Sequence, residues 1–140
     1  MTSQVVEELK SVFAESTQMA PDRLSAIYHR DIVFTDPVHT LEGLGTLTDY
    51  FTRMYSNVKS CRFEYTDQLI LENRGSLRWV MYLRHPKLAG GDEVQVAGAS
   101  FLRFGDQITH HEDYYDLGAM LYENIAVLGS AIRHVKKRLS

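Results

Sequence analysis

The chain has 140 residues, a formal net charge of −3 and a pI of about 6.0. This balance gives no general attraction to nucleic acid or to an anionic membrane surface. The single cysteine, Cys61, excludes an intramolecular disulfide and a cysteine-based metal site, and it suits a reducing compartment. No stretch approaches the roughly 20 apolar residues of a membrane-spanning helix, so we expect a cytoplasmic protein.

The first part of the chain is expected to be mainly helical. Apolar residues recur at helical spacing over residues 3–17 and again over residues 45–58. Between them, Pro21 suits the first turn of a second, short helix that carries Tyr28 on its apolar side. The apolar stripe of the third helix consists of Leu47, Tyr50, Phe51 and Met54.

A run of strands is expected to follow. Alternating apolar residues predict strands over residues 61–72, 77–84, 94–104 and 107–116, and turn residues separate them, as in antiparallel hairpins. One face of each of the first three strands carries, in turn, Phe63, Tyr65, Leu69 and Leu71; Leu77, Trp79, Met81 and Leu83; and Val94, Val96, Gly98, Ser100, Leu102 and Phe104. Helical spacing returns from Leu117 onward. This order predicts an α+β fold, with helices on one face of a curved sheet and a concave pocket between them.

Asp36 shares one face of the short strand DIVFTDP with Ile32 and Phe34. Apolar surroundings disfavour the charged form of a carboxyl group, which suits a general acid or base. The alternative is that Asp36, which directly precedes a proline, only accepts a hydrogen bond from a turn amide. The sequence leaves both interpretations open.

The closing strand, ITHHEDYYD, carries a histidine and an acid on each face. His111 and Asp113 share one face, and His110 and Glu112 share the other. Residues two apart lie about 6.6 Å apart along a strand, so either pair could contact one ligand. The alternative is a polar patch in which the histidine and the acid only pair with each other. Because neighbouring residues point to opposite faces, the cluster is not expected to hold a metal ion.

The order of elements and three segments resemble the nuclear transport factor 2-like superfamily. The segments are YHRDIVFTDPVHTLEG, SFLRFGDQI and HHEDYYD. The superfamily includes ketosteroid isomerases, SnoaL-like polyketide cyclases and limonene epoxide hydrolases. The resemblance implies one SnoaL-like domain over residues 1–140, with a core of about 3–118 and a helical extension of about 117–139. It also implies a cone, in which a curved antiparallel or mixed sheet wraps over the N-terminal helices.

The match to ketosteroid isomerases is partial. Asp36 corresponds to their proton-abstracting aspartate. The second acid of their oxyanion hole corresponds to Ser100, and their first-helix tyrosine falls near Phe13. Both strong hydrogen-bond donors of that oxyanion hole are therefore missing, so the resemblance does not extend to steroid isomerisation by that scheme.

The closing strand resembles the cyclases and the epoxide hydrolases more closely. Asp113 corresponds to the aspartate that both use, which favours the face of His111, Asp113 and Tyr115 as the inner one. The hydrolases also need an Arg-x-Asp pair on a middle strand, where this chain has Trp79 and Met81. Without that arginine and acid, epoxide opening lacks its proton donor.

The resulting hypothesis is a cofactor-independent isomerase, cyclase or hydratase that acts on a small apolar carbonyl compound. The expected catalytic residues are Asp36, His111 and Asp113, and the expected substrate contacts are Phe34, Trp79, Met81, Ser100, Phe104 and Tyr115. No metal or other cofactor is expected. The alternative is a non-catalytic domain of the same fold that binds an apolar ligand or another protein.

Family resemblance also implies a homodimer through the outer face of the sheet. This chain offers Ala97, Ala99 and Phe101 there. The extended C-terminal helix could cover the cone or reinforce the dimer.

Overall fold

The computed structural model describes residues 3–14, 19–120 and 126–139. Its elements in chain order are α1 (Gln4–Ala14), α2 (Pro21–Ile27), β1 (Tyr28–Thr35), β2 (Thr40–Glu42), α3 (Leu44–Ser56), β3 (Ser60–Leu71), β4 (Arg74–Arg84), the short 3₁₀ turn η1 (Ala89–Gly91), β5 (Val94–Phe104), β6 (Ile108–Tyr115), α4 (Leu117–Met120) and α5 (Ala126–Leu139). None of the helices in these ranges is long and apolar enough to cross a membrane.

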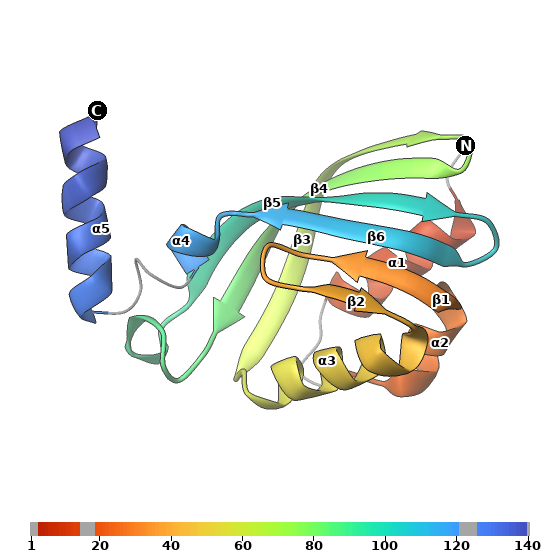
Figure 1. The fold of residues 1–140 in the computed structure, drawn as a ribbon, viewed down its shortest axis with the longest axis horizontal. Helices are drawn as coiled ribbons and strands as arrows, with labels where there is room; N and C mark the ends of the chain where they lie inside the picture. Colours follow the sequence, from red (N-terminus) through yellow and green to blue (C-terminus); the bar gives the residue numbers. More distant parts are fainter. Residues whose placement is uncertain (1–2, 15–18, 121–125, 140) are drawn as a thin grey trace.

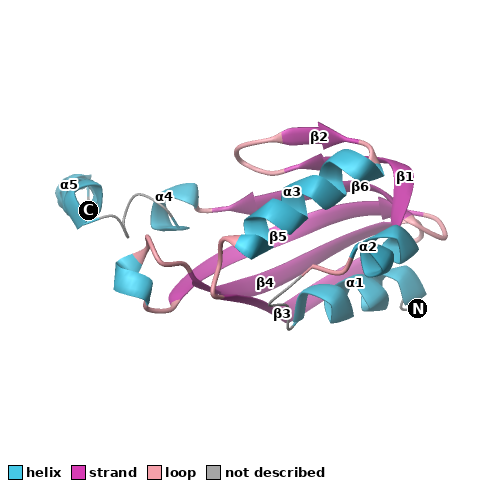
Figure 2. Ribbon diagram, turned by 90° about the horizontal axis from the view of Figure 1, so that it is seen from below, coloured by secondary structure: helices cyan, strands magenta, loops and turns pink. Residues whose placement is uncertain are grey.

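The strands form one six-stranded sheet in the order β2-β1-β6-β5-β4-β3. Neighbouring strands pair antiparallel except for β1 and β6, which are parallel. The sheet is strongly curved, and α1, α2 and α3 lie on its concave side (Figures 1 and 2). The predicted α+β fold, with a mixed sheet wrapped over the N-terminal helices, is confirmed.

The N-terminal helices form where the apolar spacing predicts them, with differences at their ends. Helix α1 buries its whole apolar stripe, which is Val5, Val6, Leu9, Val12 and Phe13, and part of the predicted helix, residues 15–17, lies outside the described residues. Tyr28 does not continue α2, because its backbone is already extended and it begins β1. The three-residue strand β2 is too short to show an alternating pattern and was not predicted.

A register shift in β3 overturns one predicted face. The pairing of β3 with β4 slips by one residue between Tyr65 and Asp67, so the alternation of side chains reverses after that point. Leu69 and Leu71, which were expected to point inward with Tyr65, are 72% and 71% exposed. Ile70 packs against the core instead.

The inner faces of β4 and β5 agree with the alternating pattern. The predicted inward residues of β4 are all buried, and those of β5 are buried apart from Gly98, which is half-buried. In β6, a second register shift beside Phe104 places Ile108 and His111 on the same inner side. The C-terminal segment, predicted to be helical from Leu117 onward, is helical in its described parts, α4 and α5, and residues 121–125 of the prediction lie outside them.

Candidate functional site

A cavity of about 290 Å³ lies between the concave face of the sheet and helix α3. Most of its wall is aromatic or aliphatic, with contributions from α1, α3 and five strands or strand ends. The aromatic part consists of Phe13, Phe34, Tyr50, Phe51, Tyr55, Phe63, Tyr65, Trp79 and Tyr115. A small number of polar groups in an apolar hollow is the usual composition of a small-molecule site.

All but one of the expected site residues line this cavity. Those that line it are Phe34, Asp36, Trp79, Met81, Ser100, His111, Asp113 and Tyr115. The exception is Phe104, which is buried but is not among the lining residues. It has the correct face of β5, but it lies at the end of the strand beside Ile108 and Gly75, within the core. Strand alternation predicts the face of the sheet to which a side chain points. It does not predict whether that part of the strand lies beside the cavity.

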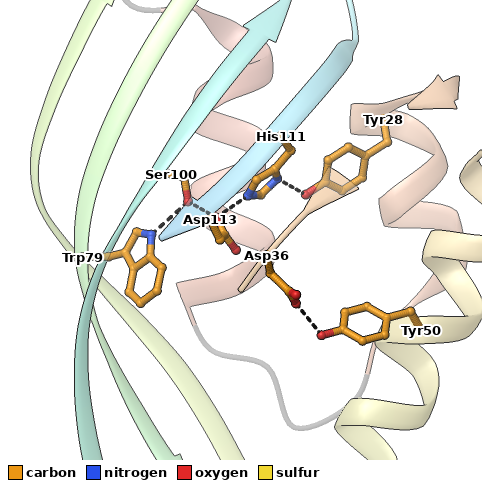
Figure 3. A network of polar contacts seen from close by, with 7 residues as sticks. All are labelled: Tyr28, Asp36, Tyr50, Trp79, Ser100, His111 and Asp113. Atoms are coloured by element: carbon orange, nitrogen blue, oxygen red, sulfur yellow. Dashed lines mark hydrogen bonds and ion pairs between the residues drawn. The ribbon is translucent and has the colours of Figure 1, made fainter. Parts of the chain in front are cut away.

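A series of hydrogen bonds runs from strand to strand along the cavity wall (Figure 3). The indole N–H of Trp79 donates to Ser100 Oγ at 2.9 Å, and the Ser100 hydroxyl donates to Asp113 Oδ1 at 2.5 Å. The same Asp113 oxygen lies 2.7 Å from His111 Nε2, and His111 Nδ1 lies 2.8 Å from the hydroxyl of Tyr28. These hydrogen bonds connect residues of four strands, β1, β4, β5 and β6, to the carboxyl group of Asp113.

The donors and acceptors of this series fit only one simple assignment of protons. The Tyr28 hydroxyl is fully buried and, among the described residues, has His111 Nδ1 as its one hydrogen-bond partner, so we assign its proton to that bond. His111 Nε2 therefore carries the ring proton and donates it to Asp113, which leaves the imidazole neutral and the carboxyl group charged. Among the described residues, Asp113 Oδ2 has no hydrogen-bond partner, so this oxygen is available to a ligand in the cavity.

Asp36 lies in the same cavity but is held differently. Its Oδ1 accepts the backbone N–H groups of Val38 and His39 at 2.9 and 2.7 Å, and its Oδ2 accepts the Tyr50 hydroxyl at 2.7 Å. Three donors stabilise the charged carboxylate. Asp36 therefore accepts hydrogen bonds from turn amides, as one of the two interpretations of the sequence expected, and it also lines the cavity.

The cavity tyrosines remain protonated donors. Burial is the main cause that raises the pKa of Tyr115 above its usual value, and the negative charges of Asp36 and Asp113 raise it further. Burial, followed by the hydrogen bond to Asp36, raises the pKa of Tyr50 in the same direction. Among the described residues no group hydrogen-bonds the Tyr115 hydroxyl, so it can donate to a bound molecule.

Sequence reasoning missed Tyr28 and Tyr50 as polar members of the site. Both occur in apolar stripes, where a tyrosine is most simply interpreted as packing, and only the fold shows that their hydroxyls meet His111 and Asp36. The available clue was chemical, since a buried tyrosine hydroxyl normally finds a partner. The choice between the two histidines is settled, because His111 is buried and His110 is exposed.

No group of three or more histidine, cysteine or acidic side chains in the described parts of the chain is arranged to hold a metal ion. His111 is surrounded by a tyrosine and an aspartate, and its neighbours His110 and Glu112 point away from the cavity.

Comparison with known proteins gives one family. The model of a SnoaL-like domain matches residues 9–111. No match was found among curated protein sequences.

Solved structures show the same fold at low sequence identity. A protein from Catenulispora acidiphila with a ketosteroid isomerase-like fold, in complex with trimethylamine, is 19% identical, with a TM-score of 0.75 over 89% of this chain and 94% of its own. A putative SnoaL-like polyketide cyclase from Jannaschia is 13% identical, with a TM-score of 0.75 over 89% and 92% of the two chains. An NTF2-like protein of unknown function from Burkholderia pseudomallei is 15% identical, with a TM-score of 0.73 over 84% and 92%.

Proposed function

The chain belongs to the family of SnoaL-like domains, and on that premise we propose that it is a cofactor-independent enzyme that moves a proton on a small, mostly apolar carbonyl compound. The observation that carries the proposal is the carboxyl group of Asp113. One of its oxygens is fixed by Ser100 and His111, and the other has no partner among the described residues and belongs to a cavity-lining side chain. A carboxylate held in this way is oriented for proton transfer.

The proposed step begins with removal of a proton from the carbon next to the substrate carbonyl. Asp113 Oδ2 takes the proton, and the electron pair moves onto the carbonyl oxygen to form an enolate. The hydroxyl of Tyr115 donates a hydrogen bond to that oxygen, which stabilises the developing charge. His111 acts as a positioning residue, since both of its ring nitrogens are already engaged.

The second half of the reaction decides its class. Return of the proton from Asp113 to a different carbon gives an isomerase. Attack of the enolate carbon on a second carbonyl of the same molecule gives a cyclase. Loss of a hydroxyl group from the carbon beyond the enolate, which leaves as water with the proton held by Asp113, gives a conjugated double bond, and the reverse of this sequence is a hydratase. Apolar walls that include Phe34, Trp79 and Met81 would hold the hydrocarbon part of the substrate in each case.

Deuterium exchange tests the proposed base without knowledge of the natural substrate. Small ketones and diketones are incubated with the protein in D₂O, and loss of the proton next to the carbonyl is followed by NMR. Asp113→Asn should lower the exchange rate by about 10²–10⁴-fold, because that is the usual contribution of a placed general base. Asp106→Asn, in an exposed turn, is the matched control and should exchange at the wild-type rate. Equal rates in wild type and Asp113→Asn would falsify the role of Asp113.

A binding domain without turnover is the second candidate. It is favoured by the mainly apolar wall of the cavity, and the Catenulispora protein of this fold is itself a complex with a small molecule, trimethylamine. In that case ligands should raise the melting temperature, but the recovered ligand should be unchanged in mass, isomeric form and deuterium content.

We also propose a homodimer through the outer face of the sheet. Phe101 and Tyr114 project from β5 and β6 on that face, contact each other edge to face at 5.7 Å, and remain 49% and 56% exposed. Beside them, Val33, Ala99 and His110 line a shallow hollow. Exposed neighbouring aromatic rings are typical of an interface, and a second copy of the chain presents the same surface.

A further inference from the structure

We infer that the ligand of this cavity carries a positively charged alkylammonium group. The inference rests on the proposed function and adds a substrate class to it. In this arrangement Asp36 and the aromatic rings beside it hold the cationic group, and Asp113 is left to exchange the proton. The two carboxylates of one cavity thereby have separate roles.

The charges that line the cavity are not balanced. Asp36 and Asp113 both face it, and His111 is neutral in the hydrogen-bond arrangement described above. None of the described residues that line the cavity is a lysine or an arginine. In a cavity whose wall is mainly apolar, a carboxylate attracts a cation more strongly than it would in water. Both aspartates would repel an anionic ligand, so anionic compounds are disfavoured as ligands of this cavity.

Asp36 is built to remain an anion and not to act as a base. Its side chain is only 3% exposed, and its oxygens already accept three hydrogen bonds. Transfer of a proton to either oxygen would compete with one of these donors, whereas Asp113 Oδ2 has no such competitor among the described residues. A fixed negative charge of this kind is suited to pair with a cation through space.

Aromatic rings line the cavity that Asp36 faces. Tyr50, whose hydroxyl bonds Asp36, packs against Phe34 and Phe51 with ring centroids 6.0 and 5.6 Å apart. Across the cavity, Trp79 and Tyr115 lie 6.3 Å apart. Faces of aromatic rings attract cations, and methylated ammonium groups are the cations for which such rings are most often used. A metal ion would need more oxygen ligands than this wall supplies.

Among the described residues, His39 is the side chain that could compete as a cation for Asp36. Its Nδ1 lies 3.6 Å from Asp36 Oδ1, and its side chain is 44% exposed. A charged His39 would weaken attraction of a second cation, so the test is carried out at pH 8, above the usual pKa of an imidazole.

Two probes of nearly equal shape separate charge from size. Choline carries a quaternary nitrogen, and 3,3-dimethylbutan-1-ol has a carbon atom in its place. Binding is followed by the fluorescence of Trp79, which is the only tryptophan of the chain and lines the cavity. We expect choline to bind wild type about tenfold more tightly than its neutral analogue, in line with the usual strength of cation–π attraction.

Variants of the Asp36 environment identify the source of that preference. Asp36→Asn keeps an acceptor for the turn amides and removes the charge, so it should bind choline more weakly than wild type does and bind the neutral probe equally well. Part of the preference for choline should remain, because the aromatic rings and Asp113 are unchanged. Asp106→Asn, which lies in an exposed turn, should behave as wild type.

The outcomes distinguish this inference from the proposed function. Equal affinity of wild type for both probes, or a preference for choline that is as large in Asp36→Asn as in wild type, overturns the inference and leaves proton exchange by Asp113 untouched. Loss of binding of the neutral probe as well in Asp36→Asn would mean that the turn had collapsed, and the comparison of the two probes on wild type then decides. If wild type exchanges the protons of the ketones slowly but strongly prefers choline, the proposed enzyme activity is rejected and the cationic ligand is retained.

Discussion

His111 and Asp113 are two residues apart on one strand, and His111 Nε2 lies 2.7 Å from Asp113 Oδ1. Their side chains share the inner face of β6 and bond each other there, which fixes the direction of the carboxyl group. The polar patch that the sequence offered as an alternative to a site is therefore present. It also leaves one carboxylate oxygen available to the cavity, so pairing and chemical function are compatible.

Tyr28 supports this pair from behind. Tyr28→Phe would remove the hydrogen bond to His111 Nδ1 while keeping the ring, and it would leave this buried acceptor without a partner among the described residues. We expect the free energy of unfolding to fall by about 1–3 kcal/mol, the usual cost of such a group. Chemical denaturation measures the change.

Tyr82→Phe is the control for that substitution, because the Tyr82 hydroxyl makes only a long, exposed hydrogen bond of 3.4 Å to Glu64 among the described residues. It should change stability by no more than about 0.5 kcal/mol. If the two variants lose the same stability, the hydrogen bond to His111 is not what makes Tyr28 important. Deuterium exchange on Tyr28→Phe adds a second measurement, since a merely structural role would not change the rate for the folded protein.

There is no room for a side chain at Gly98, and this can be tested separately. It pairs with Trp79 across β4 and β5, and a Cβ atom at Gly98 would overlap the six-membered ring of Trp79. Gly98→Ala should therefore push the indole toward the cavity and destabilise the fold by about 1–3 kcal/mol, as overpacking usually does. Denaturation followed by Trp79 fluorescence reports both effects.

The matching control is Gly105→Ala in the β5–β6 turn, where an added Cβ meets nothing within 4 Å. Its stability should equal that of wild type or rise slightly, because alanine restricts the unfolded chain. Equal stability of Gly98→Ala and Gly105→Ala would show that the sheet adjusts to the methyl group without strain.

Strand alternation predicted much of the candidate site because β4 and β5 are regular where they line the cavity. The inward direction of Trp79, Met81 and Ser100 follows from the alternation of side chains alone, once one apolar neighbour on the same strand is known to point inward. Alternation failed at Leu69 and Leu71 because a register shift is a single-residue event without a strong sequence signature. It failed differently for Phe104, whose direction is correct but which lies away from the cavity.

The contacts of tyrosine hydroxyls could not be predicted in the same way. Tyr28 reaches His111 over 83 positions of sequence, and Tyr50 reaches Asp36 from a helix. The first contact depends on the parallel pairing of β1 with β6, and the second depends on how closely α3 approaches the end of β1. Periodicity specifies neither. The resemblance of the closing strand to the cyclases supplied what the residues alone left open, namely which histidine faces inward.

The proposed dimer predicts a specific response to charge. Phe101→Glu places a carboxylate at the centre of the outer apolar surface, so it should convert a dimer into a monomer. Light scattering coupled to gel filtration measures the mass. Leu71→Glu, at an equally apolar and 71% exposed position of β3, should remain dimeric. A wild-type protein that is monomeric at high concentration contradicts the dimer.

Alkaline pH should destabilise the protein, and the sign follows from buried protonated groups. Burial raises the pKa of the Cys61 thiol from 9.0 to about 11. Between these values the folded chain keeps a proton that the unfolded chain releases, so the stabilising contribution is complete below pH 9 and is lost as the pH rises toward 11. Burial raises the pKa of Tyr65 and Tyr115 as well, which adds loss of the same sign above pH 10.

Urea unfolding at several pH values between 8 and 10 tests this expectation, and Cys61→Ala isolates the thiol. The variant has lower stability at pH 8 because the methyl group fills less of the core, so the slope with pH is compared and not the absolute value. Wild type should lose up to about 1.4 kcal/mol more per pH unit than Cys61→Ala above pH 9. Parallel curves for the two proteins would mean that the thiol titrates alike in the folded and unfolded chain, and that the wall of the cavity beside Cys61 admits water.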